Sequence, residues 1–182
     1  MKSDCGRGTA RLAVLPHLLA RLLICITLLS GCAATSTTVL DEEVVTNQKP
    51  MATYKSLIIR EFELKHDLFS DVPEARMGER ERLYARIPGQ LAEQIQRYLN
   101  ARHIYESVTL DGSPSETTLI LKGRFTRMGR FRISLEAILL DGATDQEVAF
   151  FRQTLWDVFD TTETVNSLGK GVADFIDRIQ YK

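Results

Sequence analysis

Two neighbouring stretches in the second half of the chain alternate between apolar and charged residues. In residues 117–126, and again in residues 130–139, large apolar side chains fall on odd positions and charged ones on even positions. Successive side chains of a β-strand point to opposite faces of the sheet, and the break between the stretches contains Gly129. The pattern therefore predicts a β-hairpin with one buried face and one wet face. The inward set is Leu119, Leu121, Phe125, Phe131, Ile133, Leu135, Ala137 and Leu139.

Two other segments have the apolar periodicity of amphipathic helices. The first begins near Pro88, a residue favoured at the first helical position, and runs to about Arg102. The mixed-charge segment before it, residues 66–86, is expected to be a loop or a solvated helical turn. The second helix follows Asp160, an N-cap residue with Glu163 three positions later, and another layer must cover its apolar stripe.

Three more strands are predicted at residues 54–64, 104–110 and 147–156, which are rich in β-branched and aromatic residues. The order along the chain is then strand, helix, four strands and helix. This order predicts an α+β domain with a mixed, mostly antiparallel sheet of about five strands and two helices packed on one face. The two strands joined through the first helix are expected to be parallel, and the others antiparallel.

The N-terminal part of the chain contains an apolar run that ends at a cysteine. Residues 22–32 read LLICITLLSGC, after a basic leader. The run is shorter than the roughly 20 residues of a spanning helix, and it has the plan of a secretory signal. Residues 29–32, LSGC, resemble the lipobox of bacterial lipoproteins, in which a signal peptidase cuts before the cysteine and the sulfur receives a diacylglycerol. The resemblance implies that Cys32 is the first residue of the mature protein.

The lipobox also implies a location and a domain organisation. Ala33 stands where an inner-membrane retention signal would resemble Asp, so we expect a lipid anchor in the outer membrane and a domain that faces the periplasm. Residues 1–31 are then a signal peptide, residues 32–53 the lipidated N-terminus with a flexible tether, and residues 54–182 a single α+β domain. A short edge strand at residues 39–45 is the alternative to a continuous tether.

The domain also resembles a known group of bacterial lipoproteins. The lipobox, the strand sequence YKSLIIREF, a helix, and the turn-linked sequence LEAILLDGATDQEV before a last helix are similar to the family called domain of unknown function 4410. The layout is similar to the small α+β domain at the N-terminus of TolB. No catalytic residue follows from either resemblance.

Composition argues against several classes of function. The net charge is only −1, whereas nucleic-acid binders are usually strongly basic. The cysteines, Cys5, Cys25 and Cys32, all lie at or before the expected cut, so the domain lacks a thiol for a disulfide, a metal site or a nucleophile. His66 and His103 have no partners at metal-ligand spacing, and no GxSxG motif is present. We therefore expect neither an enzyme nor a metal or other cofactor.

One surface has the composition of a binding site. Five cations are expected on or beside the wet face of the hairpin, with Glu136 as the only acid near them: Lys122, Arg124, Arg127, Arg130 and Arg132. They form either an ordinary solvated face or a site for anions such as lipid headgroups, lipopolysaccharide phosphates or an acidic partner protein.

These observations favour a non-catalytic interaction or envelope-maintenance module, held at the membrane by its lipid and able to bind another envelope protein or anionic lipid. Two alternatives stay open. One is a hydrolase of envelope material, and the other is a soluble secreted binding protein if Cys32 is not lipidated.

Overall fold

The computed structural model describes residues 37–46, 49–64, 78–129, 131–156, 158 and 160–181. The chain divides into two units, Met1–Thr35 and Ser36–Lys182, and every described residue belongs to the second. The expected cleavage site, Cys32 and Arg130 therefore lie outside the described residues. Within the described ranges, no helix combines the length and apolar character needed to cross a membrane.

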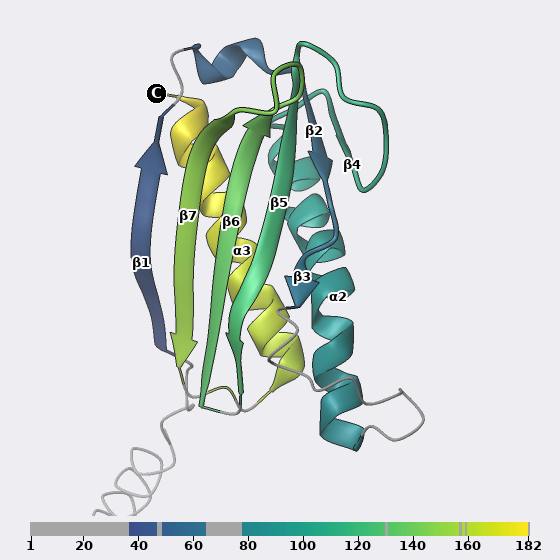
Figure 1. Cartoon of the computed structure of the whole chain (residues 1–182), viewed down its shortest axis with the longest axis vertical. Coiled ribbons are helices and arrows are strands. Elements are labelled where there is room, and N and C mark those ends of the chain that lie inside the picture. The colour runs from purple at the N-terminus through teal and green to yellow at the C-terminus, as the bar shows by residue number, and fades with distance from the viewer. Residues whose placement is uncertain are drawn as a thin grey trace, which may run out of the picture. The chain divides into compact units, whose positions relative to one another are not determined.

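The second unit is built from a long sheet and two long helices (Figure 1). The elements are β1 (Thr37–Val45), the short 3-10 helix η1 (Met51–Thr53), β2 (Ser56–Ile59), β3 (Glu63–Leu64), α2 (Glu79–Arg102), β4 (Ser107–Thr109), β5 (Thr118–Met128), β6 (Arg132–Asp141), β7 (Glu147–Trp156) and α3 (Thr161–Gln180).

The strands form one mixed sheet in the order β1-β7-β6-β5-β2-β4, with β3 beside β5. The pairs β1–β7, β7–β6 and β6–β5 are antiparallel. Strand β2 is parallel to β4, to which α2 connects it, and also to β5. The predicted α+β class and the mostly antiparallel sheet are confirmed, with seven strands instead of about five.

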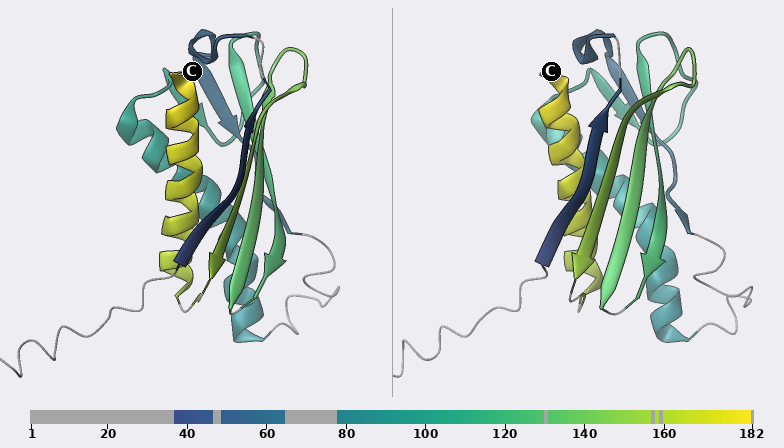
Figure 2. Two further views of the ribbon diagram at one scale, coloured as in Figure 1. Left: turned by 90° about the vertical axis from the view of Figure 1, so that its left-hand side faces the viewer. Right: turned by 60° about the vertical axis from the view of Figure 1, so that its left-hand side comes forward.

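Both helices lie against the same face of the sheet, as predicted (Figure 2). The layer between them holds fully buried side chains, such as Leu91 and Ile95 of α2 and Val172 of α3. The rings of Phe151 on β7 and Phe175 on α3 pack with centroids 5.1 Å apart. The main core of the described residues therefore lies between the sheet and the helices. Neither of these two helices covers the opposite face of the sheet.

The predicted domain boundary at residue 54 is wrong. Residues 37–45, which the sequence left open between a tether and an edge strand, form β1 and pair with β7 from Thr37 opposite Trp156 to Val45 opposite Ala149. The described part of the folded unit therefore begins at Thr37. Pairing with β7 provides hydrogen-bond partners that an isolated segment lacks, so tertiary context decides the structure of this weakly patterned stretch.

The predicted start of the first helix is also wrong. Helix α2 begins at Glu79, so Pro88 lies in its interior and not at its first turn. The added turns are held by core contacts, because Ile87 is fully buried and Tyr84 packs against the core. At the helix start, the Glu81 carboxylate accepts a hydrogen bond of 2.9 Å from the Gly78 amide. Packing thus outweighs the tendency of proline to end a helix.

Two predicted strands differ from the structure in their length or in their position in the sheet. Residues 54–64 form two short strands, β2 and β3, and residues 104–110 contribute only the three residues of β4. Strand β4 lies at the edge of the sheet beside β2 and not beside β5, so the antiparallel series of consecutive strands starts at β5. In contrast, Asp160 caps α3 as predicted and accepts hydrogen bonds from the amides of Thr162 and Glu163.

Candidate functional site

The predicted hairpin is formed by β5 and β6. The inward parity is confirmed on both strands, where Leu119, Leu121, Phe125, Ile133, Leu135, Ala137 and Leu139 are at most 2% exposed. Phe131 is the exception, with 65% of its surface exposed. It precedes β6, which begins at Arg132, so strand parity does not govern its orientation. An irregularity between Phe125 and Arg127 further shifts the register near the turn.

A row of alternating charges crosses the face of the sheet opposite to the helices. Arg124, Glu136, Arg152 and Glu42 stand directly opposite one another on β5, β6, β7 and β1. The Glu136 carboxylate accepts hydrogen bonds from Arg124 Nε at 2.8 Å and from Arg152 Nη2 at 2.8 Å. Arg152 Nη1 reaches Glu42 at 3.3 Å. We call these four residues the charge row.

Glu136 is the centre of the charge row. Its side chain is only 9% exposed, whereas those of Arg124 and Arg152 are 62% and 41% exposed. Burial raises the pKa of the Glu136 carboxyl, but the hydrogen bonds and charges of the two arginines outweigh burial and bring the pKa below its usual range. Glu136 is thus an anion at neutral pH that neutralises cations of this face.

We expect Glu136→Gln to lower the free energy of unfolding by about 1 kcal/mol at neutral pH, because two arginines would lose their shared carboxylate. Urea unfolding of the variant measures this loss. Glu42→Gln is the matched control at the exposed end of the row, where we expect a loss below about 0.5 kcal/mol. Equal losses in the two variants would contradict a central role for Glu136.

The four described residues of the predicted set of cations do not form one uniformly basic surface. Lys122 lies 3.7 Å from Asp145, Arg124 belongs to the charge row, and the Arg132 guanidinium lies 4.8 Å from the centre of the Trp156 ring. Arg127 is exposed. Anion binding by the whole set stays a prediction.

The expectation that Glu136 is the only acid near these cations is wrong. Glu42 and Asp145 also pair with basic residues there. In addition, the Asp41 carboxylate accepts a 2.5 Å hydrogen bond from the Thr154 hydroxyl, which lies 3.0 Å from that of Ser134. These acids come from β1 and from the β6–β7 turn, which sequence parity did not place beside the hairpin.

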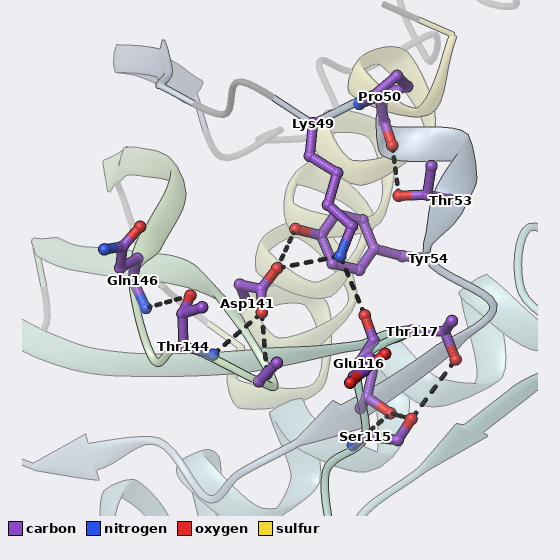
Figure 3. A network of polar contacts seen from close by, with 12 residues as sticks. Lys49, Pro50, Thr53, Tyr54, Ser115, Glu116, Thr117, Asp141, Thr144 and Gln146 are labelled. Atoms are coloured by element: carbon purple, nitrogen blue, oxygen red, sulfur yellow. Dashed lines mark hydrogen bonds and ion pairs between the residues drawn. The ribbon is translucent and has the colours of Figure 1, made fainter.

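A second acid, Asp141 at the end of β6, is 8% exposed. Tyr54 Oη and Lys49 Nζ donate to one carboxylate oxygen at 2.7 and 3.4 Å, and the amides of Ala143 and Thr144 donate to the other at 2.8 and 3.1 Å (Figure 3). Burial raises the pKa of this carboxyl, but the hydrogen bonds outweigh burial and lower the pKa to about 2. This arrangement joins the segment around η1 to the β6–β7 turn.

A polar cleft of about 380 Å³ lies beside η1, where the ends of α2 and α3 meet. Its lining includes Lys55, His103, Tyr105 and Gln180. Tyr105 is 8% exposed, and within the described part of the chain its hydroxyl and the Gln180 Oε1 atom have no hydrogen-bond partner. Burial raises the pKa of Tyr105 above its usual value. The cleft offers a neutral hydroxyl and a carboxamide, whereas no group of His, Cys, Asp or Glu suited to a metal ion occurs in the described ranges.

Two glycines in α3 have a structural role. A Cβ atom on Gly169 would lie 3.1 Å from Gln94 of α2, and one on Gly171 would lie 2.2 Å from Gln153 of β7. The helix therefore approaches both neighbouring elements closely at these two positions.

No family model matches this sequence, and no curated protein matches it significantly. Among solved structures, the PelC dodecamer from Paraburkholderia phytofirmans is similar at 13% identity and a TM-score of 0.47, covering 76% of this chain and 97% of that chain. Protein XCC0632 from Xanthomonas campestris, named with domain of unknown function 330, is similar at 12% identity and a TM-score of 0.40, covering 72% and 85%. That family is not domain of unknown function 4410, so the resemblance to the latter stays a prediction.

Proposed function

We propose that this chain is a lipid-anchored, non-catalytic protein of the bacterial envelope, attached through Cys32 to the outer membrane and facing the periplasm. The observation that supports this proposal most directly is the short distance along the chain between the lipobox cysteine and the folded unit. Thr37, the first residue of β1, is only five positions after Cys32. The domain is then held at the membrane surface instead of at the end of a long tether.

The length of the linker limits the distance between the domain and the membrane. A chain spans at most about 3.3–3.6 Å per residue, so five residues cover no more than about 18 Å. The tether expected from sequence, with about 20 residues before the domain, would have reached about 70 Å. A domain at the shorter distance works on the membrane or on proteins at its surface, which fits an interaction or envelope-maintenance module.

Two substitutions test the anchor and its location. We expect Cys32→Ala to accumulate as an unprocessed precursor, because the lipobox cysteine carries the lipid on which cleavage depends. We expect Ala33→Asp to be processed normally but to fractionate with the inner membrane, while the unchanged protein fractionates with the outer membrane. Mass spectrometry of the N-terminal peptide and separation of the two membranes measure these outcomes.

Cleavage and release of Cys32→Ala at the mature size would contradict the lipoprotein proposal and support the soluble secreted alternative. Identical fractionation of Ala33→Asp and the unchanged protein would contradict only the proposed sorting. The interaction partner is proposed to be another envelope protein, and crosslinking in intact cells followed by identification of the adduct would name it.

A further inference from the structure

One end of the sheet gathers aromatic and basic side chains beside the start of β1. Thr37 stands opposite Trp156, and Trp156 stands opposite Arg132 at the start of β6. The β5–β6 turn closes at the same end, which is the lower end in Figure 1. The first described residue of the folded unit, the end of β7 and the hairpin turn therefore lie together.

The side chains at this end are exposed to an extent unusual for large aromatic residues. Phe131 is 65% exposed and Trp156 is 40% exposed. The Arg132 guanidinium stacks 4.8 Å from the centre of the Trp156 ring, and Arg127 at the end of β5 is exposed. We call Arg127, Phe131, Arg132 and Trp156 the hairpin end. Aromatic rings with adjacent arginines are typical of protein surfaces that enter the headgroup region of a bilayer.

Chain length decides which end of the domain is nearest to the lipid. If Cys32 carries a diacylglycerol, Thr37 lies within about 18 Å of the membrane interface. Strand β7 has 10 residues and spans about 33 Å, so the far end of the sheet lies that much further along the strand direction. Of the two ends of the sheet, the hairpin end is thus the one that the anchor brings to the bilayer.

We infer that the hairpin end is a membrane-contact surface, in which Phe131 and Trp156 enter the headgroup region of a phospholipid bilayer and Arg127 and Arg132 lie against lipid phosphates. This inference rests on the proposed lipid attachment at Cys32. It differs from an anion site on the wet face of the hairpin, because Arg124 and Lys122 are already paired with acids there.

The chemistry of the hairpin end determines which lipids it contacts. Phe131 and Trp156 present exposed apolar rings, and the phosphate that an arginine would contact is present in zwitterionic as well as in anionic phospholipids. The aromatic side chains therefore supply most of the contact, and anionic lipid adds little. Contact is therefore expected in zwitterionic phosphatidylcholine vesicles as well as in vesicles that contain phosphatidylglycerol.

Trp156 makes a direct test practical because it is the only tryptophan of the chain. The full-length lipidated protein is reconstituted into phosphatidylcholine vesicles, with and without bromine atoms near the top of the acyl chains. We expect the brominated lipid to quench most of the Trp156 fluorescence, and the emission to shift to shorter wavelength. Emission that is the same in both kinds of vesicle would overturn the inference.

Two substitutions provide a matched comparison. Phe131→Ser changes an exposed residue outside the strands, and we expect quenching to fall roughly threefold or more because the apolar contact is lost. Tyr181→Ser removes an aromatic that is 85% exposed at the C-terminal end of α3, and we expect no change. Equal quenching in the two variants would contradict a specific role of the hairpin end.

The test separates this inference from the proposed function. Mass spectrometry of the same sample reports whether Cys32 carries a lipid, and sedimentation with vesicles reports attachment. A lipidated, attached protein whose Trp156 is not quenched overturns the membrane-contact surface and leaves the anchor intact. An unlipidated Cys32 contradicts the proposed function, whereas quenching by added brominated vesicles would still support the contact.

Discussion

Replacing Asp141 by Asn is expected to lower the free energy of unfolding at neutral pH by about 2 kcal/mol, or the melting temperature by about 5–8 °C. The carboxylate accepts hydrogen bonds from Tyr54, Lys49 and two backbone amides, and its pKa is about 2 in the folded protein. An amide nitrogen in place of one oxygen would face the Tyr54 and Lys49 donors. Urea unfolding at pH 7 measures the loss.

The pKa of Asp141 also predicts how stability depends on pH. A carboxyl whose pKa is lower in the folded than in the unfolded chain stabilises the fold fully above its unfolded pKa of about 4. That contribution is lost as the pH falls from about 4 towards 2, because the unfolded chain takes up the proton first. The pKa values of Glu136 and Asp174 are also lowered, so other carboxyls add to the same acid sensitivity.

Asp145→Asn is the control for Asp141→Asn in the same turn. Asp145 is exposed, and its φ of 56° is a left-handed conformation that Asn tolerates well. We expect this control to unfold like the unchanged protein, apart from the weak ion pair with Lys122. Stability curves of Asp141→Asn and of the unchanged protein that stay parallel from pH 7 to pH 2 would contradict the assignment to Asp141.

The parts of the fold that sequence predicted best depend on local patterns. Alternation with a period of two is a property of each strand, so the inward faces of β5 and β6 followed from residues 117–139. The cap at Asp160 is also local and was predicted correctly. For β1 the sequence did not decide between a tether and an edge strand, because residues 41–43 are three consecutive acids. Only pairing with β7, more than 100 positions away, makes this segment a strand.

The candidate site was harder to predict because it depends on register. Arg124 and Glu136 were expected on one face, but Glu42 and Arg152 join them only through pairings between β1, β7 and β6. Asp141 has the sequence context of an ordinary turn residue, and its partner Tyr54 lies 87 positions away. The aromatic character of the hairpin end was missed because Phe131 was assigned to the inward parity.

Gly123 on β5 is expected to tolerate no side chain. A Cβ atom at this position would lie 2.1 and 2.3 Å from ring carbons of Phe62 and 2.9 Å from the Glu136 carbonyl oxygen. Phe62 is 2% exposed and packs beside Phe125, so its ring cannot move without losing buried contacts. We expect Gly123→Ala to lower the free energy of unfolding by about 3 kcal/mol, as measured by urea unfolding.

A double-mutant cycle distinguishes this clash from a general effect on the strand. Phe62→Ala alone is expected to cost about 3–4 kcal/mol because a buried ring is lost. In that background the ring no longer opposes Gly123→Ala, so the second substitution should cost about 1 kcal/mol, from the carbonyl contact that remains. Gly129→Ala is the control at the end of the hairpin, where the nearest heavy atom is 3.8 Å away, and it should change stability by less than about 0.5 kcal/mol. Additive losses of Phe62→Ala and Gly123→Ala would show that the two residues do not share the space between β3 and β5.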